Sequence, residues 1–375
     1  MNSNPFLDAA APGIPGLAPY VPGKPVEELE RELGIADSVK LASNENPLGP
    51  SPLGVRAARE ATSTIHLYPD DTAFRLRKRL ARLHGVQPGQ LIFGSGSSDI
   101  LAMVAQTFLH PGVNAVYAAH SFAMYAIYTQ AAAAEGRVAP ALAADHPLQP
   151  YGHDLDAMLS LVDGNTRVIY IANPNNPTGT WLAAADLKTF IERVPEQVVV
   201  VLDEAYTQYV QEPEFPDGIP WIAEHPNLLV TRTFSKIYGL AGLRVGYGMG
   251  NPELLEVIAR VRHPFNVGSI ALAAAEAALE DESFIQRSVQ TNRVGLEELM
   301  AGCAALGLDT IPSVGNFLCV AFDRPGRAVY EELLRQAVIV RPVDNYGLPN
   351  HLRITVGTAA ENQRLLEALR VVLGR

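Results

Sequence analysis

Residues 230–247, VTRTFSKIYGLAGLRVGY, bring a lysine and an arginine to the end of an apolar run. The run Leu228 to Val230 leads into a turn rich in threonine and serine, Thr231 to Ser235, and Lys236 follows directly. A glycine-spaced segment then presents Arg244 ahead of a second apolar run. A lysine among hydroxyl groups and near an arginine suits a Schiff base with a phosphorylated aldehyde cofactor. A solvated loop lysine is the alternative, and this stretch alone does not separate the two interpretations.

The composition is typical of a compact protein with a large core. The 375 residues are 48% hydrophobic and 18% charged, and this length predicts two domains, or one large and one small. The net charge of −11 argues against nucleic acid and anionic membranes as partners. Apolar runs are shorter than the ~20 residues that a membrane helix needs, and no signal-peptide pattern is present.

The cysteine and histidine content predicts the compartment and argues against a metal site. Two cysteines, Cys303 and Cys319, are too few for a disulfide framework and suit a reducing compartment, so we expect a cytoplasmic protein. The nine histidines show neither HExxH nor paired ligand spacing, so no metal is expected.

Short apolar runs alternate with helical stretches from about residue 91 onward. Because these runs lack in/out alternation, they predict strands that are buried on both faces, and hence an α/β fold with a mostly parallel sheet covered by helices. One such helix is expected over 183–194. The runs are VIYIA (168–172), VVVVL (198–202), NLLVT (227–231) and LRVGYGM (243–249).

The pattern of apolar and helical segments changes after Pro264, and the new pattern predicts a second, smaller α+β unit. There, a long Ala-rich helical region over 269–306 is followed by the strand-like FLCVAF, a helix through RAVYEELLRQ, the runs VIVRPV and LRITVG, and a closing helix. We therefore expect an N-terminal arm with a short helix over 1–40, a large domain over 41–262 and a small domain over 263–375, with the arm packing on the small domain.

Polar residues follow several of the predicted strands, and in parallel sheets the ligand site lies beyond the carboxyl ends of the strands. VIYIA ends in NPNNPTG (173–179), VVVVL ends in Asp203, and NLLVT leads to Lys236. The two Asn-Pro steps favour extended backbone, so this loop can hold Asn176 fixed against a ligand. The segment Gly94 to Ser98 opens a helix, whose free N–H groups attract phosphate.

Asp203 closes an apolar strand, so the cost of burying its carboxylate must be offset by a cationic partner. A protonated pyridine nitrogen would serve. Tyr206 lies three residues on, on the same side if a helical turn follows, where it can hydrogen-bond an oxygen on the same ring. The alternatives are an aspartate that pairs with an arginine or caps a helix, and a packed aromatic residue.

Eight short stretches together resemble one family. The chain is similar to the aspartate-aminotransferase superfamily of pyridoxal-phosphate enzymes, called fold type I, and within it to the histidinol-phosphate aminotransferases. The resemblance implies a large domain with a mostly parallel seven-stranded sheet sandwiched by helices, plus a smaller α+β C-terminal domain. The stretches, in the family's order, are KLASNENPLGPSP, YPDDTAFRLRKRLA, FGSGSSDIL, NPNNPTG, DEAY, FSKIYGLAGLRVGY, HPFNV and LRITVGT.

The resemblance implies the cofactor pyridoxal 5′-phosphate and a role for each matching residue. Lys236 would bind its aldehyde and shuttle a proton, and Asp203 would pair with the ring nitrogen. Asn176 and Tyr206 would hydrogen-bond the ring oxygen, and Phe122 would stack on the ring face. The residues that would bind the cofactor phosphate are Ser97, Ser98, Ser235 and Arg244. Tyr68 would reach the cofactor phosphate of the neighbouring subunit, in a homodimer with shared active sites. Phe122 departs from the tyrosine of many relatives, and Ser98 from an acidic residue.

The resemblance also implies the reaction. Arg353 would grip the substrate carboxylate, with Arg341, Tyr20 and Asn46 as further substrate contacts. The amino donor would be L-histidinol phosphate and the acceptor 2-oxoglutarate, giving imidazole-acetol phosphate and L-glutamate in histidine biosynthesis. Three alternatives stay open: an aromatic amino-acid aminotransferase acting on phenylalanine or tyrosine, an amino-acid-phosphate decarboxylase of the same fold, and a non-catalytic scaffold that binds the cofactor.

Overall fold

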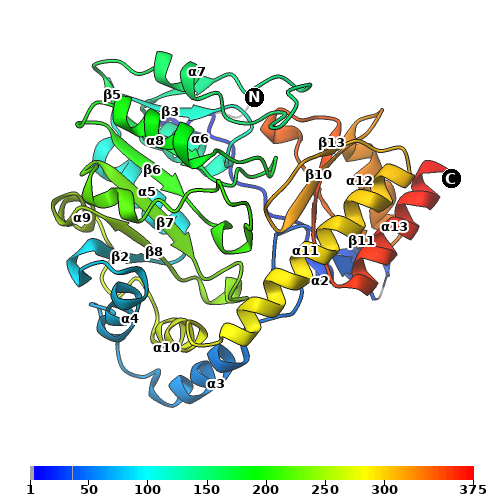
Figure 1. The fold of residues 1–375 in the computed structure, drawn as a ribbon, viewed down its shortest axis with the longest axis horizontal. Helices are drawn as coiled ribbons and strands as arrows, with labels where there is room; N and C mark the ends of the chain where they lie inside the picture. Colours follow the sequence, from blue (N-terminus) through cyan, green and yellow to red (C-terminus); the bar gives the residue numbers. More distant parts are fainter. Residues whose placement is uncertain (1–3, 36) are drawn as a thin grey trace.

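Two sheets of different size organise the chain. In the computed structural model, which describes residues 4–35 and 37–375, a seven-stranded sheet lies between two layers of helices and a smaller sheet stands beside it (Figure 1). The order in the large sheet is β2-β8-β7-β6-β5-β3-β4, and only β8 runs against the other strands. Its strands are β2 (Leu91–Gly94), β3 (Asn114–Ala118), β4 (Glu135–Ala139), β5 (Thr166–Ala172), β6 (Val199–Asp203), β7 (Leu228–Thr233) and β8 (Gly246–Gly250).

The central strands are apolar on both sides because both faces of the sheet are covered. Along β6, Val199 and Val201 pack with one layer of helices, whereas Val200 and Leu202 pack with the other. The first layer consists of α5 (Ser97–Phe108), α6 (Ala123–Ala131) and α9 (Pro252–Ala259); the second consists of α4 (Phe74–His84), α7 (Leu155–Ser160), α8 (Ala184–Arg193) and α10 (Ser269–Ala278). This two-sided burial confirms the prediction of a mostly parallel sheet covered by helices.

The smaller sheet has the order β12-β13-β10-β9 and is antiparallel. A second pair, β1 with β11, runs parallel beside it and joins the N-terminal part of the chain to this unit. The elements are β1 (Val39–Lys40), β9 (Thr310–Ile311), β10 (Phe317–Ala321), β11 (Val338–Ile339), β12 (Arg341–Pro342), β13 (His351–Thr355), α11 (Glu282–Ala305), α12 (Gly326–Arg335) and α13 (Ala359–Leu373).

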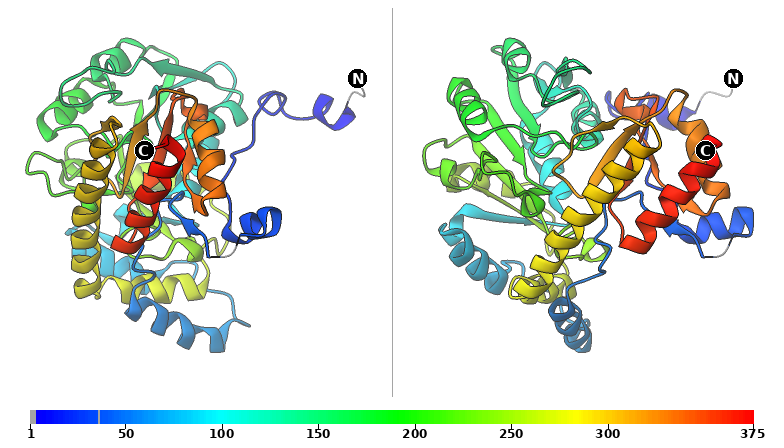
Figure 2. Two further views of the ribbon diagram at one scale, coloured as in Figure 1. Left: turned by 90° about the vertical axis from the view of Figure 1, so that its right-hand side faces the viewer. Right: turned by 45° about the vertical axis from the view of Figure 1, so that its right-hand side comes forward.

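The N-terminal segment is an arm that leaves the body of the molecule (Figure 2). It contains the short helix α1 (Pro5–Asp8) and leads to α2 (Val26–Leu33), which ends at Gly34 as the sequence predicted. The buried Leu29 of α2 packs with Ala42, Leu334 and Ile339, so this helix belongs with the smaller sheet. Residues 1–3 and 36 of the expected 1–40 segment lie outside the described residues.

The structure adds two details to the expected helical region and the expected mostly parallel sheet. The Ala-rich region 269–306 is two helices, α10 and α11, because the chain turns at residues 279–281. The run 243–249 contributes β8, which is antiparallel to its neighbours.

The domain boundaries stay a prediction. Helix α10 packs against α3 (Pro52–Ala61) and α4, beside the large sheet. Short 3-10 turns complete the chain: η1 (Thr62–Thr64), η2 (Pro88–Gln90), η3 (Thr207–Tyr209), η4 (Pro220–Ala223), η5 (Ala241–Leu243) and η6 (Asp344–Tyr346).

None of the described helices is both long and apolar enough to cross a membrane.

A buried ion pair ties β7 to the chain beyond β6. The guanidinium of Arg232 donates from Nε and Nη2 to Glu204 Oε2, at 2.9 and 2.6 Å, and Nη2 also donates to Asp217 Oδ1 at 2.9 Å. The Glu204 side chain is fully buried. This ion pair fixes the position of β7 relative to Glu204, and the loss of either partner would leave an uncompensated buried charge.

We expect Arg232→Met to lower the free energy of unfolding by about 3–5 kcal/mol, because it leaves Glu204 buried and without its cation. Chemical denaturation followed by circular dichroism measures the change. Lys188→Met is the matched control: Lys188 pairs with Glu224 at 2.8 Å on the surface, so its replacement should leave the midpoint nearly unchanged. Equal midpoints for the Arg232 variant and the parent would contradict the argument.

Candidate active site

One cavity at the carboxyl ends of β5, β6 and β7 gathers nearly all of the predicted site residues. Its volume is about 240 Å³, and it opens between the two sheets. These residues come from distant parts of the chain. They lie together because the carboxyl ends of parallel strands meet at the same edge of the sheet. The predicted residues that line it are Tyr20, Ser97, Ser98, Phe122, Asn176, Asp203, Tyr206, Ser235, Lys236, Arg244, Arg341 and Arg353.

Lys236 follows β7 and lies mostly buried at the bottom of this cavity. Its Nζ donates to the carbonyl oxygen of Ser43 at 3.2 Å and lies 5.6 Å from the centroid of the Tyr206 ring. Burial lowers the pKa of this amine from 10.5 to about 7, and the neighbouring charge of Arg353 acts in the same direction. The amine therefore loses its proton far more easily near neutral pH than a lysine in water, and a nucleophile or general base must be neutral.

Asp203 ends β6 and is almost completely buried. Its Oδ1 accepts from Thr231 Oγ1 at 2.9 Å, and its Oδ2 accepts from Tyr125 Oη at 3.0 Å. Burial raises the pKa of this carboxyl group, whereas the two hydroxyl donors and Lys236 favour the ionised form. A buried carboxylate with only neutral donors in direct contact suits a cationic ligand.

A chain of hydrogen bonds links the two sheets across the cavity. The Tyr206 hydroxyl accepts from Asn176 Nδ2 at 3.3 Å and from Asn44 Nδ2 at 3.0 Å. Asn176 Oδ1 in turn accepts from Arg353 Nη1 at 2.6 Å, and Arg353 Nη2 donates to the carbonyl of Ala42 at 2.7 Å. Burial raises the pKa of Tyr206 to about 12, so its hydroxyl stays neutral at physiological pH.

Arg353 comes from β13 of the smaller sheet, and its guanidinium keeps one unused donor. Its Nε is buried and has no hydrogen-bond partner among the described residues. The guanidinium carbon lies 5.5 Å from the centroid of the Phe317 ring, which holds the fork in place. A planar fork with a free donor, set in a cavity, is suited to a carboxylate or phosphate.

A helix start and a second arginine also line the cavity, a combination suited to an anion. Ser97 and Ser98 open α5, whose first backbone N–H groups have no partner within the helix. Arg244 Nη1 donates to Ser235 Oγ at 3.1 Å, and Arg244 Nη2 donates to the Ser95 carbonyl at 3.3 Å. A Cβ at Gly96 would collide with the Arg244 guanidinium, so this glycine lets the arginine reach the helix start.

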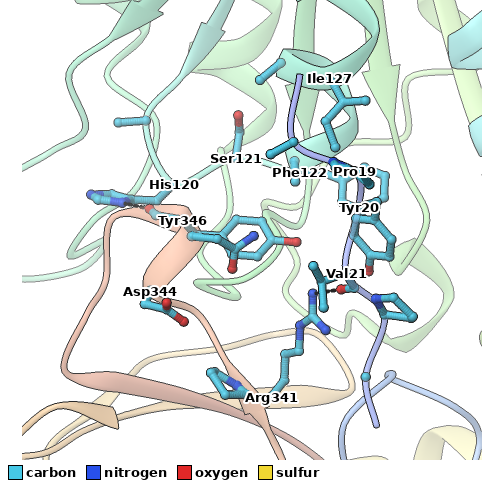
Figure 3. A pocket seen from close by; sticks show the side chains of 18 of the residues that line it. Pro19, Tyr20, Val21, His120, Ser121, Phe122, Ile127, Arg341, Asp344 and Tyr346 are labelled. Atoms are coloured by element: carbon cyan, nitrogen blue, oxygen red, sulfur yellow. Dashed lines mark hydrogen bonds between the residues drawn. The ribbon is translucent and has the colours of Figure 1, made fainter. Parts of the chain in front are cut away.

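A second cavity of about 540 Å³ adjoins the first, and Tyr20, Phe122 and Arg341 line both. Figure 3 shows the arm with Tyr20 and Val21 on one side and Arg341 reaching toward it, where Arg341 Nη2 donates to the Val21 carbonyl at 2.5 Å. The Arg341 guanidinium carbon also lies 5.5 Å from the centroid of the Tyr20 ring. Arg341 and Tyr20, both predicted as substrate contacts, thus lie where the two cavities adjoin.

Two predicted residues do not line the cavity. Asn46 donates from Nδ2 to the Ile237 carbonyl and to Ser288 Oγ, both at 2.9 Å, so its amide is engaged inside the fold. Asn44, two residues earlier, lines the cavity instead and was missed, because the sequence does not distinguish the two asparagines of SNENP. Tyr68 is 83% exposed and stacks on Phe265, with ring centroids 4.6 Å apart, outside the cavity of its own chain.

Sequence reasoning also missed Thr231 and Tyr125, the two donors to Asp203. Thr231 stands opposite Asp203 on the neighbouring strand, a register that only strand pairing reveals. Tyr125 lies 78 positions away in the sequence, and no local pattern marks it.

Comparison with known proteins gives a consistent result. The sequence profile of aminotransferase class I and II matches residues 36–369. A histidinol-phosphate aminotransferase 2 of Pseudomonas fluorescens (strain Pf0-1) is 55% identical over 372 residues, which cover 99% of each chain. A protein of the same name from Pseudomonas aeruginosa (strain PAO1) is 53% identical and covers 98% of each chain.

A solved structure agrees with these relatives. The histidinol-phosphate aminotransferase of Sinorhizobium meliloti, crystallised in complex with pyridoxal-5′-phosphate, superposes with a TM-score of 0.86 at 27% identity and covers 97% of each chain. The profile match over most of the chain, the near full-length relatives and the shared architecture show that this chain belongs to the class I and II aminotransferases.

Proposed function

We propose that the chain is a pyridoxal-phosphate-dependent aminotransferase that transfers the amino group of L-histidinol phosphate to 2-oxoglutarate, as a step of histidine biosynthesis. The products are imidazole-acetol phosphate and L-glutamate. The observation that carries the proposal is one cavity that contains both a lysine of lowered pKa and three arginines, Arg244, Arg341 and Arg353. The full-length relatives with this name support the choice of substrate.

The residues of the cavity fit a phosphorylated pyridine aldehyde. Lys236 offers an amine, Asp203 offers a buried carboxylate that accepts from two neutral hydroxyl groups, and Arg244 with Ser235 and the start of α5 offers an anion site. Phe122 offers an aromatic face, and Asn176 and Tyr206 offer polar groups between the two ends. When bound, the cofactor supplies an electron sink that stabilises negative charge at the substrate Cα.

Lys236 and Asp203 divide the proton chemistry. Lys236, whose amine has a lowered pKa, would take the proton from the substrate Cα and carry it to the other side of the transferred amino group. Asp203 would favour a proton on the pyridine nitrogen, because a positive charge would stabilise its buried carboxylate. Tyr206 keeps its own proton and donates a hydrogen bond rather than acting as a base.

The arginines explain how one site takes both substrates. L-histidinol phosphate carries a phosphate monoester and 2-oxoglutarate carries two carboxylates, and each of these groups matches a guanidinium fork. In our proposal, the Arg353 guanidinium binds the anionic group of either substrate, and Arg341 and Tyr20, which line the same cavity, contact it as well. Asn46 has no part in this proposal, since its amide is engaged elsewhere.

A homodimer with shared active sites is part of the proposal, with Tyr68 reaching the cofactor phosphate of the partner subunit. Support comes from the apolar side chains near Tyr68 that one chain leaves in water, since such patches mark protein interfaces. Ile65, Leu67 and Phe74 are 64%, 59% and 62% exposed. A cytoplasmic location belongs to the same proposal and is supported by the buried, unpaired Cys303 and Cys319.

The lowered pKa of Lys236 predicts a pH profile for the cofactor-free protein. Only the neutral amine attacks an aldehyde, so attachment of pyridoxal, trapped with borohydride, should speed up as pH rises and level off above about pH 7. Mass spectrometry of the peptide that contains Lys236 measures the rate. Lys236→Ala should remove this label, and Lys188→Ala should keep it. A rate that still rises tenfold per pH unit beyond pH 9 would mean that the pKa is not lowered.

A substrate panel tests the proposed reaction. We expect kcat/KM for L-histidinol phosphate to exceed that for phenylalanine or tyrosine by at least about 100-fold, because the phosphate gives Arg353 and Arg341 a partner that a phenyl ring lacks. Glutamate formation from 2-oxoglutarate measures turnover. A preference for phenylalanine would select the aromatic alternative. Carbon dioxide release without an amino acceptor would select the decarboxylase, and cofactor binding without turnover of any donor would select the scaffold.

Mixed dimers test site sharing. Subunits with Tyr68→Phe and subunits with Lys236→Ala are unfolded together, refolded and compared with each variant refolded alone. A hybrid should contain one site with both residues intact, so the mixture should gain activity above the sum of the two parents. No gain, with hybrid formation verified by native mass spectrometry, would count against Tyr68 acting in the partner's site.

A further inference from the structure

The Asp203 carboxylate accepts hydrogen bonds from two hydroxyl groups, one on a residue earlier in the chain and one on a later residue. Thr231, its neighbour across the β6–β7 pair, donates to Oδ1 at 2.9 Å, and Tyr125 of α6 donates to Oδ2 at 3.0 Å. Neither donor is charged, and the charge of Lys236 also favours the ionised carboxylate. Tyr206 faces Asp203 as well, as a neutral phenol. The direction and charge of the carboxylate therefore depend on the two hydroxyl groups.

Tyr125 is fully buried and is positioned on both sides. Its ring stacks on Tyr170 of β5, with centroids 4.8 Å apart and planes at 5°. It meets Phe122 edge to face, with centroids 5.8 Å apart and planes at 88°. Tyr125 does not line the cavity itself, but it contacts two residues that do, Asp203 and Phe122. Because the Tyr125 ring is fixed between β5 and α6, it fixes the positions of Asp203 and Phe122 relative to these two elements.

The Tyr125 hydroxyl favours the ionised form of Asp203. Among the described residues, Asp203 is the hydroxyl group's one hydrogen-bond partner. If Asp203 carried a proton on Oδ2, the two hydrogens would compete for one contact and a buried donor would lose its acceptor. Burial also raises the pKa of Tyr125 far above its usual range, so the phenol remains a donor at every physiological pH.

We propose that Tyr125 is a positioning residue, which keeps Asp203 ionised and turned into the cavity and at the same time supports the aromatic face of Phe122. The proposal rests on the role of Asp203 opposite the pyridine nitrogen in the proposed function. It adds a residue that touches neither cofactor nor substrate but sets how strongly the ring nitrogen is kept protonated.

The test is Tyr125→Phe, which keeps the stacked ring and removes only the hydroxyl group. In the cofactor-free protein labelled with ¹³C at the aspartate carboxyl carbon, the titration midpoint of Asp203 should rise by about one pH unit or more, because the charged form loses a donor. The Asp203 signal is assigned by its absence in Asp203→Asn. In the loaded enzyme we expect kcat to fall about tenfold with KM for the amino donor unchanged.

Two variants make the result specific. Tyr170→Phe is the matched control: within residues 4–35 and 37–375 its buried hydroxyl has no hydrogen-bond partner, and its ring belongs to the same stack, so its removal should leave the Asp203 midpoint unchanged. Thr231→Val removes the opposite donor and should raise the midpoint as Tyr125→Phe does. An Asp203 midpoint in Tyr125→Phe equal to that of the parent, in a protein with unchanged thermal stability, would overturn the proposal.

The variants Asp203→Asn and Tyr125→Phe together distinguish an error in the role of Asp203 from an error in the role of Tyr125. If Asp203→Asn binds pyridoxal phosphate as tightly as the parent and keeps full turnover, the role of Asp203 itself is wrong. If that variant loses affinity while Tyr125→Phe leaves the Asp203 midpoint unchanged, only the inference about Tyr125 is wrong.

Discussion

Exclusion of water from the edge where three parallel strands end is the constraint on which the site depends. Burial is the first cause of all three pKa shifts there: downward for Lys236, and upward for Asp203 and Tyr206. In water these groups would be a cation, an anion and a neutral phenol. In the cavity the amine loses its proton more easily and the carboxylate demands a positive partner, which makes the pair suited to an aldehyde on a protonated ring.

The same edge is closed by the smaller sheet. Arg353 reaches from β13 to Asn176 in the loop after β5, and the backbone N–H of Asn44 donates to Thr355 Oγ1 at 2.9 Å while its side chain donates to Tyr206. Without the smaller sheet the cavity would keep its lysine and aspartate but lose the Arg353 guanidinium. Because β1 pairs with β11, the N-terminal part of the chain is also needed to complete this wall.

Prediction from the sequence succeeded where a signal is local. Apolar runs without alternation at 168–172, 198–202 and 227–231 correspond to β5, β6 and β7, and the last residues of these strands, Ala172, Asp203 and Thr233, line the cavity. It left open the details that packing decides. The run 243–249 looks like the others, yet β8 is antiparallel, and the alanines of 269–306 do not reveal the turn that separates α10 from α11.

The sequence by itself determined the type of fold and the chemical groups of the site, because strand burial and cofactor-like motifs are written in neighbouring residues. Only the tertiary structure decided which of Asn44 and Asn46 enters the cavity, that Arg353 meets Asn176, and that Tyr125 supports Asp203. The physical reason is that these contacts join residues far apart in the chain. Their geometry depends on strand register and on the packing of two sheets, which no local pattern encodes.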